Sequence, residues 1–476
     1  MISLMAQYLA FDLGAESGRA ITGTLQQETL QVEEIHRFPN EPMRTDEALA
    51  WDIERLWAEI QRGIRVAGES GFRADGIGID TWGVDYGLLD AQGELIENPR
   101  HYRDARNNGM LEAVFARVPR EEVFAATGIQ FMQINTLFQL YAASLGARAT
   151  LARAQRLLNM PDLFNYWLTG EARSETTIAS TTQFFNPATM TWATGLLERL
   201  GLPTQILCPL VMPGTALGKT HTPPHTTVYA TAGHDTASAV AAAPAAGGDD
   251  WCYISSGTWS LMGLELDRPV IGPESLAHNF TNEVGVAGKI RLLKNIAGLW
   301  LLQECRRAWM AEGIAYSYEQ LARMAAQARP HSAVIDPDAF LEPGGMPGKI
   351  ADYCRRTGQE PPATHAEYAR AILESLALRY RHVLESLEIL SGRKIAVIHI
   401  VGGGSRNGVL NQFVADATGR RVVAGPAEAT AIGNILVQAM GAGELQGLDD
   451  IRAVVRRSFH PETYEPGGEW ERCGGK

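Results

Sequence analysis

The chain of 476 residues lacks an excess of basic charge. It has 42 Lys and Arg against 54 Asp and Glu, which gives a formal net charge of −12. A protein that binds nucleic acid needs a basic face to neutralise phosphates, so this balance argues against a nucleic-acid partner. The net negative charge does not exclude an enzyme that binds small anionic ligands, provided that the charge around its binding site is neutralised locally.

The sequence also lacks the cysteine patterns of disulfide frameworks and zinc sites. Its five cysteines, at positions 208, 252, 305, 354 and 473, are odd in number and scattered, without a Cys-x-x-Cys pair or a Cys/His cluster. This distribution favours reduced thiols and a cytoplasmic location. The sequence shows no signal-peptide pattern and no run that approaches 18 apolar residues, so we expect no membrane attachment.

The length exceeds that of one ordinary domain. At roughly 150 residues per domain, 476 residues predict two or three. The small and polar run 245–250 is a candidate linker, with Pro244 ending the helix before it. We therefore predict an N-terminal domain over 1–245 and a C-terminal domain over 246–476.

The stretch 8–20 contains the first candidate ligand-binding loop. An apolar strand ends at Asp12, and the turn after it carries Gly14, Ser17 and Gly18 before a second strand begins. Two glycines with a hydroxyl between them allow successive backbone N–H groups to point into one hollow that holds a phosphate. Asp12, at the rim, could hold the Mg²⁺ that accompanies ATP. A hairpin turn that binds nothing is the alternative.

The order of elements indicates a duplicated α/β fold. A third strand, a helix that begins at Asp52 and a buried strand at 76–80 complete the opening of a ribonuclease H-like domain. The pattern of strand, Gly-plus-hydroxyl turn and strand recurs at 251–265, where Gly257 corresponds to Gly14. A repeat at about half the chain length is typical of duplication, although strand–Gly–strand also arises by chance.

Two further segments are candidates for ligand contact. Helical patterns fill 109–169, and after a short strand at 228–231 a small-residue helix begins near Asp235, which is either an N-cap or a carboxylate facing a ligand. In the second half, a buried strand at 394–401 leads into the turn 402–404. Three glycines at the carboxyl end of a parallel strand let a ring or a ribose lie against bare backbone. The alternative is a plain strand-to-helix turn, for which a single glycine would suffice.

Six stretches together resemble the FGGY carbohydrate kinases over nearly the whole chain. They are Phe11–Arg19, Gly78–Tyr86, His101–Arg106, Gly233–Thr236, Ser255–Ser260 and Val401–Gly404. The resemblance implies two ribonuclease H-like domains of the actin/hexokinase type, with ATP and a ketose in the cleft between them, and a sugar 1-phosphate and ADP as products. The stretches 81–85 and 255–259 separate this group from xylulose and glycerol kinases. They favour L-rhamnulose as the sugar, with L-fuculose or L-ribulose as alternatives.

The resemblance also implies roles for single residues, which it places on matching positions. Sugar contacts fall on Gly83, His234, Asp235, Thr236 and Asn295, and Asp235 matches the general base. Nucleotide contacts fall on Ala15, Glu16, Ser17, Gly18, Arg19, Thr258, Gln303 and Gly403.

One position departs from the family pattern. Many members of the matching branch carry Ser at the position of Glu16. Because a carboxylate repels a phosphate, we expect the Glu16 side chain to point outward and backbone N–H groups with Ser17 to bind the nucleotide. The oligomeric state, monomer or dimer, cannot be read from the sequence.

Several alternatives stay open on the residues alone. Trp82 could stack on the apolar face of a deoxy sugar or simply pack in the core, and Asp104 with Arg106 favours a solvated ion pair. An actin-like ATPase would share the phosphate loops but would not need a base at Asp235. A sugar sensor could lose Asp12 or Asp235 without loss of binding.

Overall fold

The computed structural model describes residues 5–45, 48–330, 333–467 and 470, so that Cys473 lies outside the described residues. The chain forms two compact units. Unit 1 comprises Met1–Ala242, Glu265–Leu292 and Ala429–Ser458, and unit 2 comprises Ala243–Leu264, Leu293–Glu428 and Phe459–Lys476. Both combine a mixed β-sheet with helices, which confirms the predicted two-domain α/β class. The predicted boundary after residue 245 lies near the first change of unit, but two segments of the predicted second domain belong to unit 1.

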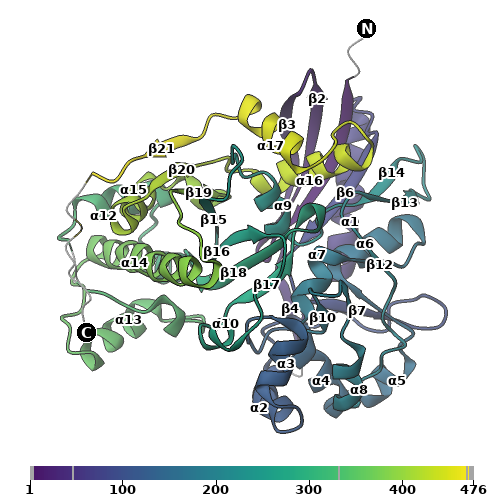
Figure 1. Ribbon diagram of the computed structural model, residues 1–476, viewed down its shortest axis with the longest axis horizontal. Helices are drawn as coiled ribbons and strands as arrows, with labels where there is room; N and C mark the ends of the chain where they lie inside the picture. The colour runs from purple at the N-terminus through teal and green to yellow at the C-terminus, as the bar shows by residue number, and fades with distance from the viewer. Residues whose placement is uncertain (1–4, 46–47, 331–332, 468–469, 471–476) are drawn as a thin grey trace. The chain divides into compact units, whose positions relative to one another are not determined.

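The main sheet of unit 1 has the strand order β13-β14-β6-β1-β2-β3. Its strands are β1 (Ala6–Leu13), β2 (Ser17–Gln26), β3 (Thr29–Pro39), β6 (Gly76–Thr81), β13 (Thr215–Lys219) and β14 (Thr227–Ala230). β1, β6 and β14 run parallel, and the other neighbours pair antiparallel. The carboxyl ends of the three parallel strands therefore lie at one edge of the sheet, of which Figure 1 labels β6 and β14.

Strand β6 shows how the alternation of side chains builds the two faces of this sheet. Ile77 and Ile79 belong to the apolar core beneath helix α1 (Ile53–Glu69), which begins after the predicted cap Asp52. On the other face, a Cβ added to Gly78 would lie 2.5 Å from Asn434 Oδ1 of helix α16 (Ala429–Gly441). The glycine thus permits α16 to lie directly on the sheet.

The remaining elements of unit 1 surround this sheet. They are β4 (Pro42–Arg44), β5 (Leu49–Trp51), β7 (Tyr86–Leu89), η1 (Ala105–Asn107), α2 (Met110–Phe115), α3 (Arg120–Thr127), α4 (Thr136–Gly146), α5 (Arg148–Arg153), β8 (Arg156–Asn159), α6 (Met160–Thr169), β9 (Ser174–Glu175), α7 (Thr176–Ala179), η2 (Ser180–Thr182), β10 (Phe185–Asn186), β11 (Thr191–Trp192), α8 (Thr194–Leu200), β12 (Leu210–Val211), α9 (Asp235–Ala241), α10 (Pro273–Ala277), β17 (Thr281–Val284), η3 (Val286–Gly288) and α17 (Leu448–Ser458). The helical expectation for 109–169 is correct for α2 to α6 but not for the loop 128–135 or for β8, which pairs antiparallel with β7. β8 is only four residues long and runs directly into α6, so periodicity could not separate the two.

Unit 2 repeats the strand arrangement of unit 1. Its sheet has the order β17-β18-β16-β15-β19-β20-β21. The strands wholly or partly in unit 2 are β15 (Trp251–Ser256), β16 (Trp259–Leu266), β18 (Ile290–Ala297), β19 (Val397–Val401), β20 (Arg421–Ala424) and β21 (Glu462–Tyr464). Residues 265–266 of β16 and 290–292 of β18 belong to unit 1. β15 pairs antiparallel with β16 and parallel with β19, which pairs parallel with β20. These partnerships match those of β1, β2, β6 and β14, so the predicted duplication is confirmed in topology.

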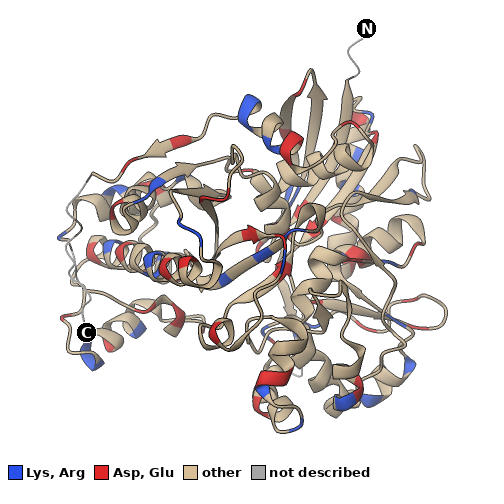
Figure 2. Cartoon of the chain, in the orientation of Figure 1, with Lys and Arg blue, Asp and Glu red and all other residues tan. Residues whose placement is uncertain are grey.

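The helices of unit 2 are α11 (Trp300–Ala311), α12 (Tyr318–Gln327), η4 (Pro337–Ala339), α13 (Met346–Arg356), α14 (His365–Ser391), η5 (Gly403–Arg406) and α15 (Gly408–Thr418). Acidic and basic residues are interspersed along α14, as the red and blue segments of Figure 2 show. Arg370 pairs with Glu374 at 2.7 Å and Arg381 with Glu385 at 3.0 Å, each one turn apart. Within the described ranges, no helix has both the length and the apolar character needed to cross a bilayer.

Candidate active site

The first predicted phosphate loop connects β1 to β2 and is held closed by its own backbone. The Gly14 N–H donates to the Ser17 carbonyl at 2.9 Å. The buried Asn40 side chain donates to the Gly14 carbonyl at 2.8 Å, and its N–H donates to the Glu16 carbonyl at 2.9 Å. Glu16 is exposed, whereas Ala15 and Ser17 are half-buried. The loop is therefore preformed, and Asn40, which the sequence analysis missed, braces it.

Asp12 and Arg19 form an ion pair at the mouth of this loop. They face each other in the register of β1 and β2, and the Arg19 guanidinium donates to Asp12 Oδ2. In the part of the chain that the structure describes, no three His, Cys, Asp or Glu side chains come together to hold a metal. A single carboxylate fits a Mg²⁺ ion that the nucleotide brings with phosphate ligands of its own, provided that Arg19 releases Asp12.

A second carboxyl, Asp80, lies next to Asp12 in the register of β1 and β6 and is fully buried. Asn434 of α16 donates to its Oδ2, while Oδ1 has no hydrogen-bond partner. Burial raises the pKa of Asp80 well above its ordinary value, and the nearby Asp12 and Asp235 carboxylates add to the rise. Asp80 is therefore less readily ionised than an exposed carboxyl.

The predicted sugar contacts of unit 1 follow the ends of β6 and β14. Thr81 pairs with His234 as an isolated bridge, and the Thr81 N–H donates to the Gly233 carbonyl at 2.9 Å. A Cβ added to Gly83 would lie 3.4 Å from His234 Nε2, so Gly83 and the imidazole are neighbours. The structure thus brings Gly83, His234 and the residues after it together at the edge that also carries Asp12.

Asp235 is not the N-cap of helix α9, because His234 occupies that position and Asp235 is the first helical residue. The Asp235 carboxylate accepts hydrogen bonds from Thr236 N at 2.5 Å and from Thr236 Oγ1 at 3.1 Å. Its side chain is 31% exposed. Burial raises the pKa of Asp235; His234 opposes this rise and the nearby Asp12 carboxylate adds to it. A reachable carboxylate with a raised pKa suits a general base.

Glu175, another residue that the sequence analysis missed, shapes the turn before α9. It is buried and accepts the Gly233 N–H at 2.9 Å and the Thr177 N–H at 2.7 Å. Thr177 Oγ1 in turn accepts the His234 N–H at 3.2 Å. These bonds fix the backbone that presents His234 and Asp235.

Asp85 and Trp82 form a buried cluster. Asp85 Oδ2 accepts from the indoles of Trp51 at 2.6 Å and Trp82 at 3.0 Å, and Gln139 donates to Oδ1 at 2.8 Å. The Trp51 and Trp82 rings lie 4.1 Å apart, and Trp82 is only 6% exposed. These contacts favour the packing role for Trp82.

The turn at Asp104 and Arg106 differs from the expected solvated ion pair. Asp104 is buried and caps the short helix η1 by accepting the Arg106 N–H at 2.9 Å. Its other oxygen accepts the Leu49 N–H at 2.7 Å. Both carboxylate oxygens of Asp104 thus accept backbone N–H groups, one at the start of η1 and one at the start of β5. Such backbone contacts cannot be predicted from the pattern of charges in the sequence.

In unit 2, the structure brings together Thr258 and Gln303. Thr258 lies in the turn between β15 and β16, and its carbonyl accepts the Trp300 N–H at 3.1 Å at the start of α11. Gln303 Nε2 donates to Thr258 Oγ1 at 3.2 Å, while Gln303 Oε1 is buried without a hydrogen-bond partner. Helix α11 therefore fixes the turn at Thr258, and the side-chain oxygen of Gln303 remains available as a hydrogen-bond acceptor.

The three glycines after β19 differ in what a side chain would meet at each position. Gly402 has φ +84°, a conformation that side chains rarely adopt, and a Cβ on Gly404 would lie 2.0 Å from Ser256 Oγ. Gly403 is exposed, and a Cβ there would meet nothing within 4 Å. Gly402 and Gly404 thus form the close turn against β15, and Gly403 presents open backbone near the end of the same parallel strands. The predicted sugar contact Asn295 lies half-buried on β18 of unit 2.

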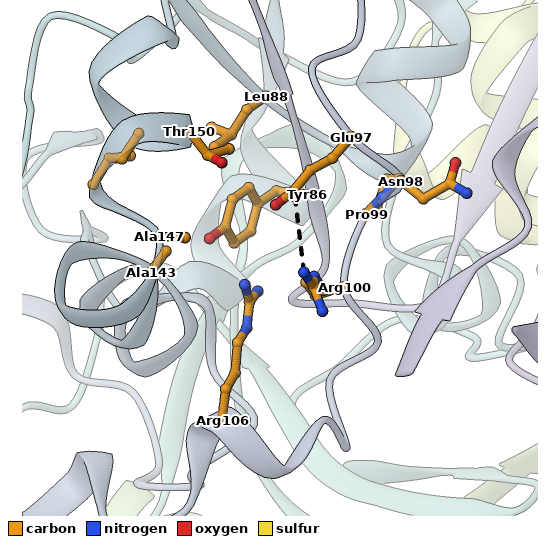
Figure 3. Close-up of a pocket in the computed structure, with 11 residues that line it drawn as sticks. Tyr86, Leu88, Glu97, Asn98, Pro99, Arg100, Arg106, Ala143, Ala147 and Thr150 are labelled. Atoms are coloured by element: carbon orange, nitrogen blue, oxygen red, sulfur yellow. Dashed lines mark ion pairs between the residues drawn. The ribbon is translucent and has the colours of Figure 1, made fainter. Parts of the chain in front are cut away.

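One small cavity of unit 1 lies among residues other than the predicted site. Figure 3 shows Arg106 pointing toward Tyr86, with Glu97 and Arg100 paired at 3.8 Å nearby. The cavity holds about 20 Å³, which is room for a water molecule rather than a sugar.

Comparisons with known proteins agree over nearly the whole chain. Sequence models of the FGGY family of carbohydrate kinases match residues 7–241 with the N-terminal domain and residues 252–442 with the C-terminal domain. The rhamnulokinase of Bacteroides thetaiotaomicron is 46% identical over 468 residues, which cover 96% of each chain. The rhamnulokinase of Enterococcus faecalis is 42% identical and covers 96% of this chain and 94% of its own. The crystal structure of gluconate kinase from Lactobacillus acidophilus superposes with a TM-score of 0.80 at 15% identity, over 98% of this chain and 94% of that chain, and shows the same fold.

Proposed function

Because the chain belongs to the FGGY family of carbohydrate kinases, we propose that it phosphorylates a ketose with ATP and that this ketose is L-rhamnulose. The observation that carries the proposal is the neighbourhood of His234, Asp235 and Gly83 at the sheet edge that also holds Asp12 and its loop. The identity to two rhamnulokinases along the whole length supports L-rhamnulose as the sugar. L-Fuculose and L-ribulose are the alternatives to be tested beside it.

Asp235 is the general base in the proposed reaction. The C1 hydroxyl oxygen of the ketose bonds to the γ-phosphorus of ATP, the bond from that phosphorus to the bridging oxygen of ADP breaks, and the hydroxyl proton passes to Asp235. Such transfers need alignment and charge stabilisation more than covalent chemistry. Gly83, His234, Thr236 and Asn295 align the sugar, while residues 15–19, Thr258, Gln303 and Gly403 bind the nucleotide.

Mg²⁺ is the proposed metal, held through Asp12 and the nucleotide phosphates. When bound, the ion neutralises the charge that develops on the transferred phosphoryl group. This chain contributes the carboxylate of Asp12 and, beside it, Asp80, whose raised pKa reduces its tendency to carry a negative charge. We also propose a cytoplasmic location, which the four buried free thiols of the described chain support.

A coupled assay of ADP release tests the function. The full chain is incubated with ATP and Mg²⁺ and with L-rhamnulose, L-fuculose, L-ribulose or D-xylulose at equal concentrations. We expect the highest kcat/KM with L-rhamnulose and only background release without sugar. Release that does not depend on a ketose would indicate an ATPase, and sugar binding without ADP release would indicate a sensor. Preference for another ketose would replace L-rhamnulose.

Asp235→Asn tests the base directly. Asn can keep the hydrogen bonds from Thr236, because its Oδ1 accepts them equally, so we expect an unchanged melting temperature. It cannot take the hydroxyl proton, so turnover should fall by roughly 10²–10⁴-fold. Asp352→Asn is the control, because it makes the same substitution in a surface ion pair with Arg355 on α13, and it should remain within a few-fold of wild type. Turnover of Asp235→Asn close to that of wild type would refute the role of Asp235.

A further inference from the structure

The turn that carries Gly83 contains a strained residue that no step of the proposed reaction explains. Val84 has a φ of +68°, in the left-handed region that a β-branched side chain disfavours. Across it, the Asp85 N–H donates to the Gly83 carbonyl at 3.0 Å. A hydrogen bond between residues two positions apart, with a positive φ at the residue between them, is the rare and strained form of the γ-turn.

Two buried threonines hold Val84 in this turn from both sides. The Val84 N–H donates to Thr181 Oγ1 of η2 at 3.1 Å, and Thr136 Oγ1, at the start of α4, donates to the Val84 carbonyl at 2.6 Å. Gln139 also approaches this carbonyl, at 3.3 Å, although its amide group makes two shorter bonds elsewhere. All of these residues belong to unit 1.

The Thr181 hydroxyl is committed as the acceptor for Val84. A hydroxyl has one proton, and that of Thr181 goes to the Ile178 carbonyl at 2.8 Å, within its own helical segment. Its lone pairs therefore remain for the Val84 N–H. Serine at position 181 could make both bonds, whereas valine, which has nearly the same shape, could make neither.

The turn leaves one backbone donor of its segment unused. Four of the five amides from 81 to 85 donate to protein acceptors: Thr81 to Gly233, Trp82 to Leu13, Val84 to Thr181 and Asp85 to Gly83. In the part of the chain that the structure describes, nothing accepts the N–H of Gly83, which is half-buried. A Cβ on Gly83 would lie 3.4 Å from His234 Nε2 and equally far from Thr181 Oγ1. The free donor thus lies among the predicted sugar contacts, and backbone donors in native proteins rarely go without a partner.

The strain indicates that the shape of this turn matters. Backbone strain persists only where the surroundings hold it, and strained residues cluster at ligand sites. Glycine at position 84 would adopt the same φ without strain but would also adopt many others. Valine is stiff, so with both threonines in place it restricts the turn to one shape. Without them, the left-handed conformation loses its support and the Gly83 peptide groups turn with it.

We propose that Thr181 is a positioning residue, which holds Val84 in the strained turn and so keeps the Gly83 N–H ready to donate to an oxygen of the ketose. Thr136 supports the same turn from the carbonyl side. The proposal rests on the function proposed above, in which Gly83 contacts the sugar, and it assigns the donor atom of that contact and the side chain that supports it.

The first test is hydrogen exchange of the Val84 amide in the free, full-length protein. The protein is labelled with ¹⁵N-valine, and the signal that is missing in Val84→Ile belongs to Val84. We expect slow exchange in wild type and in Thr181→Ser, and exchange faster by at least about tenfold in Thr181→Val, because the amide loses its acceptor. Thr182→Val is the matched control. Thr182 is the next residue of η2 and is buried, but its hydroxyl donates to the Ala179 carbonyl, so the Val84 amide should exchange as in wild type.

The second test is steady-state kinetics with the preferred ketose and with ATP. In Thr181→Val we expect kcat/KM for the ketose to fall by roughly 10–100-fold, as when a small displacement disturbs a positioned ligand, while KM for ATP stays within about twofold of wild type. Thr181→Ser and Thr182→Val should leave both constants within about threefold of wild type. Adding Val84→Gly to Thr181→Val should raise kcat/KM for the ketose again by at least about threefold, because glycine adopts the left-handed turn without support.

The outcomes separate the inference from the function. Slow exchange of the Val84 amide in Thr181→Val, or a wild-type kcat/KM for the ketose in that variant, would overturn the inference and leave the kinase assignment intact. So would equal losses in Thr181→Val and Thr182→Val, or a double variant no better than Thr181→Val. A wild-type protein without ketose-dependent ADP release would overturn the function, while the exchange rates would still test the turn. If Thr181→Val does not fold, Thr136→Val removes the bond to the Val84 carbonyl and faces the same kinetic criteria.

Discussion

Asp12 is the residue at the end of β1 whose carboxylate meets Arg19. Replacing it by Ala removes the proposed ligand of Mg²⁺ but leaves Gly83, His234 and Asp235 in place. We expect the Mg²⁺ concentration for half-maximal rate to rise at least about tenfold and turnover to fall by roughly 10²-fold or more, as when a charge-stabilising group of a phosphoryl-transfer site is lost. Calorimetric titration should show ketose affinity within a few-fold of wild type. Loss of ketose binding with an unchanged Mg²⁺ dependence would contradict this assignment.

Asp85 provides a pH-dependent contribution to stability. Its carboxyl is buried, and burial raises its pKa to about 6 against the opposing hydrogen bonds from Trp51, Gln139 and Trp82. In the unfolded chain the pKa is about 3.9. Between these values the folded state binds more protons than the unfolded state, so this contribution is complete below about pH 4 and is lost as the pH rises through about 6.

The variant Asp85→Asn removes this titration and keeps an acceptor for the two indoles. Relative to wild type, its free energy of unfolding should therefore increase by roughly 1–3 kcal/mol between pH 4.5 and 7.5, from about two pKa units at about 1.4 kcal/mol each. Urea unfolding at a series of pH values measures the difference. Parallel pH profiles for the two proteins would show that Asp85 does not titrate in this range.

At the scale of elements, helix α9 depends on a close approach to α16. A Cβ on Gly433 of α16 would lie 1.8 Å from the carbonyl oxygen of Ser238 in α9. Gly433→Ala must therefore push apart two helices, of which α9 begins with Asp235. We expect a loss of stability of about 3 kcal/mol or more, at the upper end of overpacking effects, visible as a lower melting temperature. Turnover below the melting range should also fall, because α9 moves with Asp235.

Gly68 of α1 is the matched control for this substitution. It is also helical, but a Cβ there would meet nothing within 4 Å. Gly68→Ala should leave stability unchanged or raise it by up to about 1 kcal/mol through helix propensity. If both alanine variants melt alike, the close contact between α16 and α9 does not limit stability.

The elements that the sequence predicted well are those whose signals are local. Helix α1 has a capping Asp52 and a regular apolar stripe, and its N-terminus was placed correctly. Strand β19 was predicted three residues too early, because Ile395 and Ala396 continue its apolar run although the ladder with β15 begins only at Val397. Of the two roles left open for Asp235, the N-cap is excluded, because caps are decided by backbone angles and His234 has the extended conformation there.

The residues around the site that sequence reasoning missed act through distant partners. Asn434 reaches Asp80 across 354 positions, and Arg291 reaches His234 across 57. No spacing or periodicity links such positions, since their contact depends on the chain returning to the same sheet. By contrast, Gly83 and residues 234–236 lie in short contiguous motifs, so they could be singled out from the sequence, although their roles remain predictions.

At the scale of the whole molecule, unit 1 is completed by a segment from near the end of the chain. Gln438 of α16 donates to the Leu9 carbonyl at 3.1 Å, and Gly23 of β2 leaves the space that Ile435 fills. The family's N-terminal sequence model ends at residue 241, long before α16. The first 245 residues therefore include neither α16 nor the β17–β18 segment that carries Glu283 and Arg291.

A fragment of residues 1–245 should consequently fail to form a cooperative unit on its own. Without α16, the face of β1, β2 and β6 that it covers would meet water, and so would Ile435, which packs at Gly23. Burial of one such side chain contributes about 1.5–3 kcal/mol. We expect a broad thermal transition, binding of a hydrophobic dye and rapid proteolysis. A fragment of residues 1–292 mixed with a peptide of residues 425–458 should recover a sharper transition than either piece alone, because the peptide restores α16. A fragment 1–245 that melts as sharply as the full chain, and within a few degrees of it, would show instead that the first half is an independent domain.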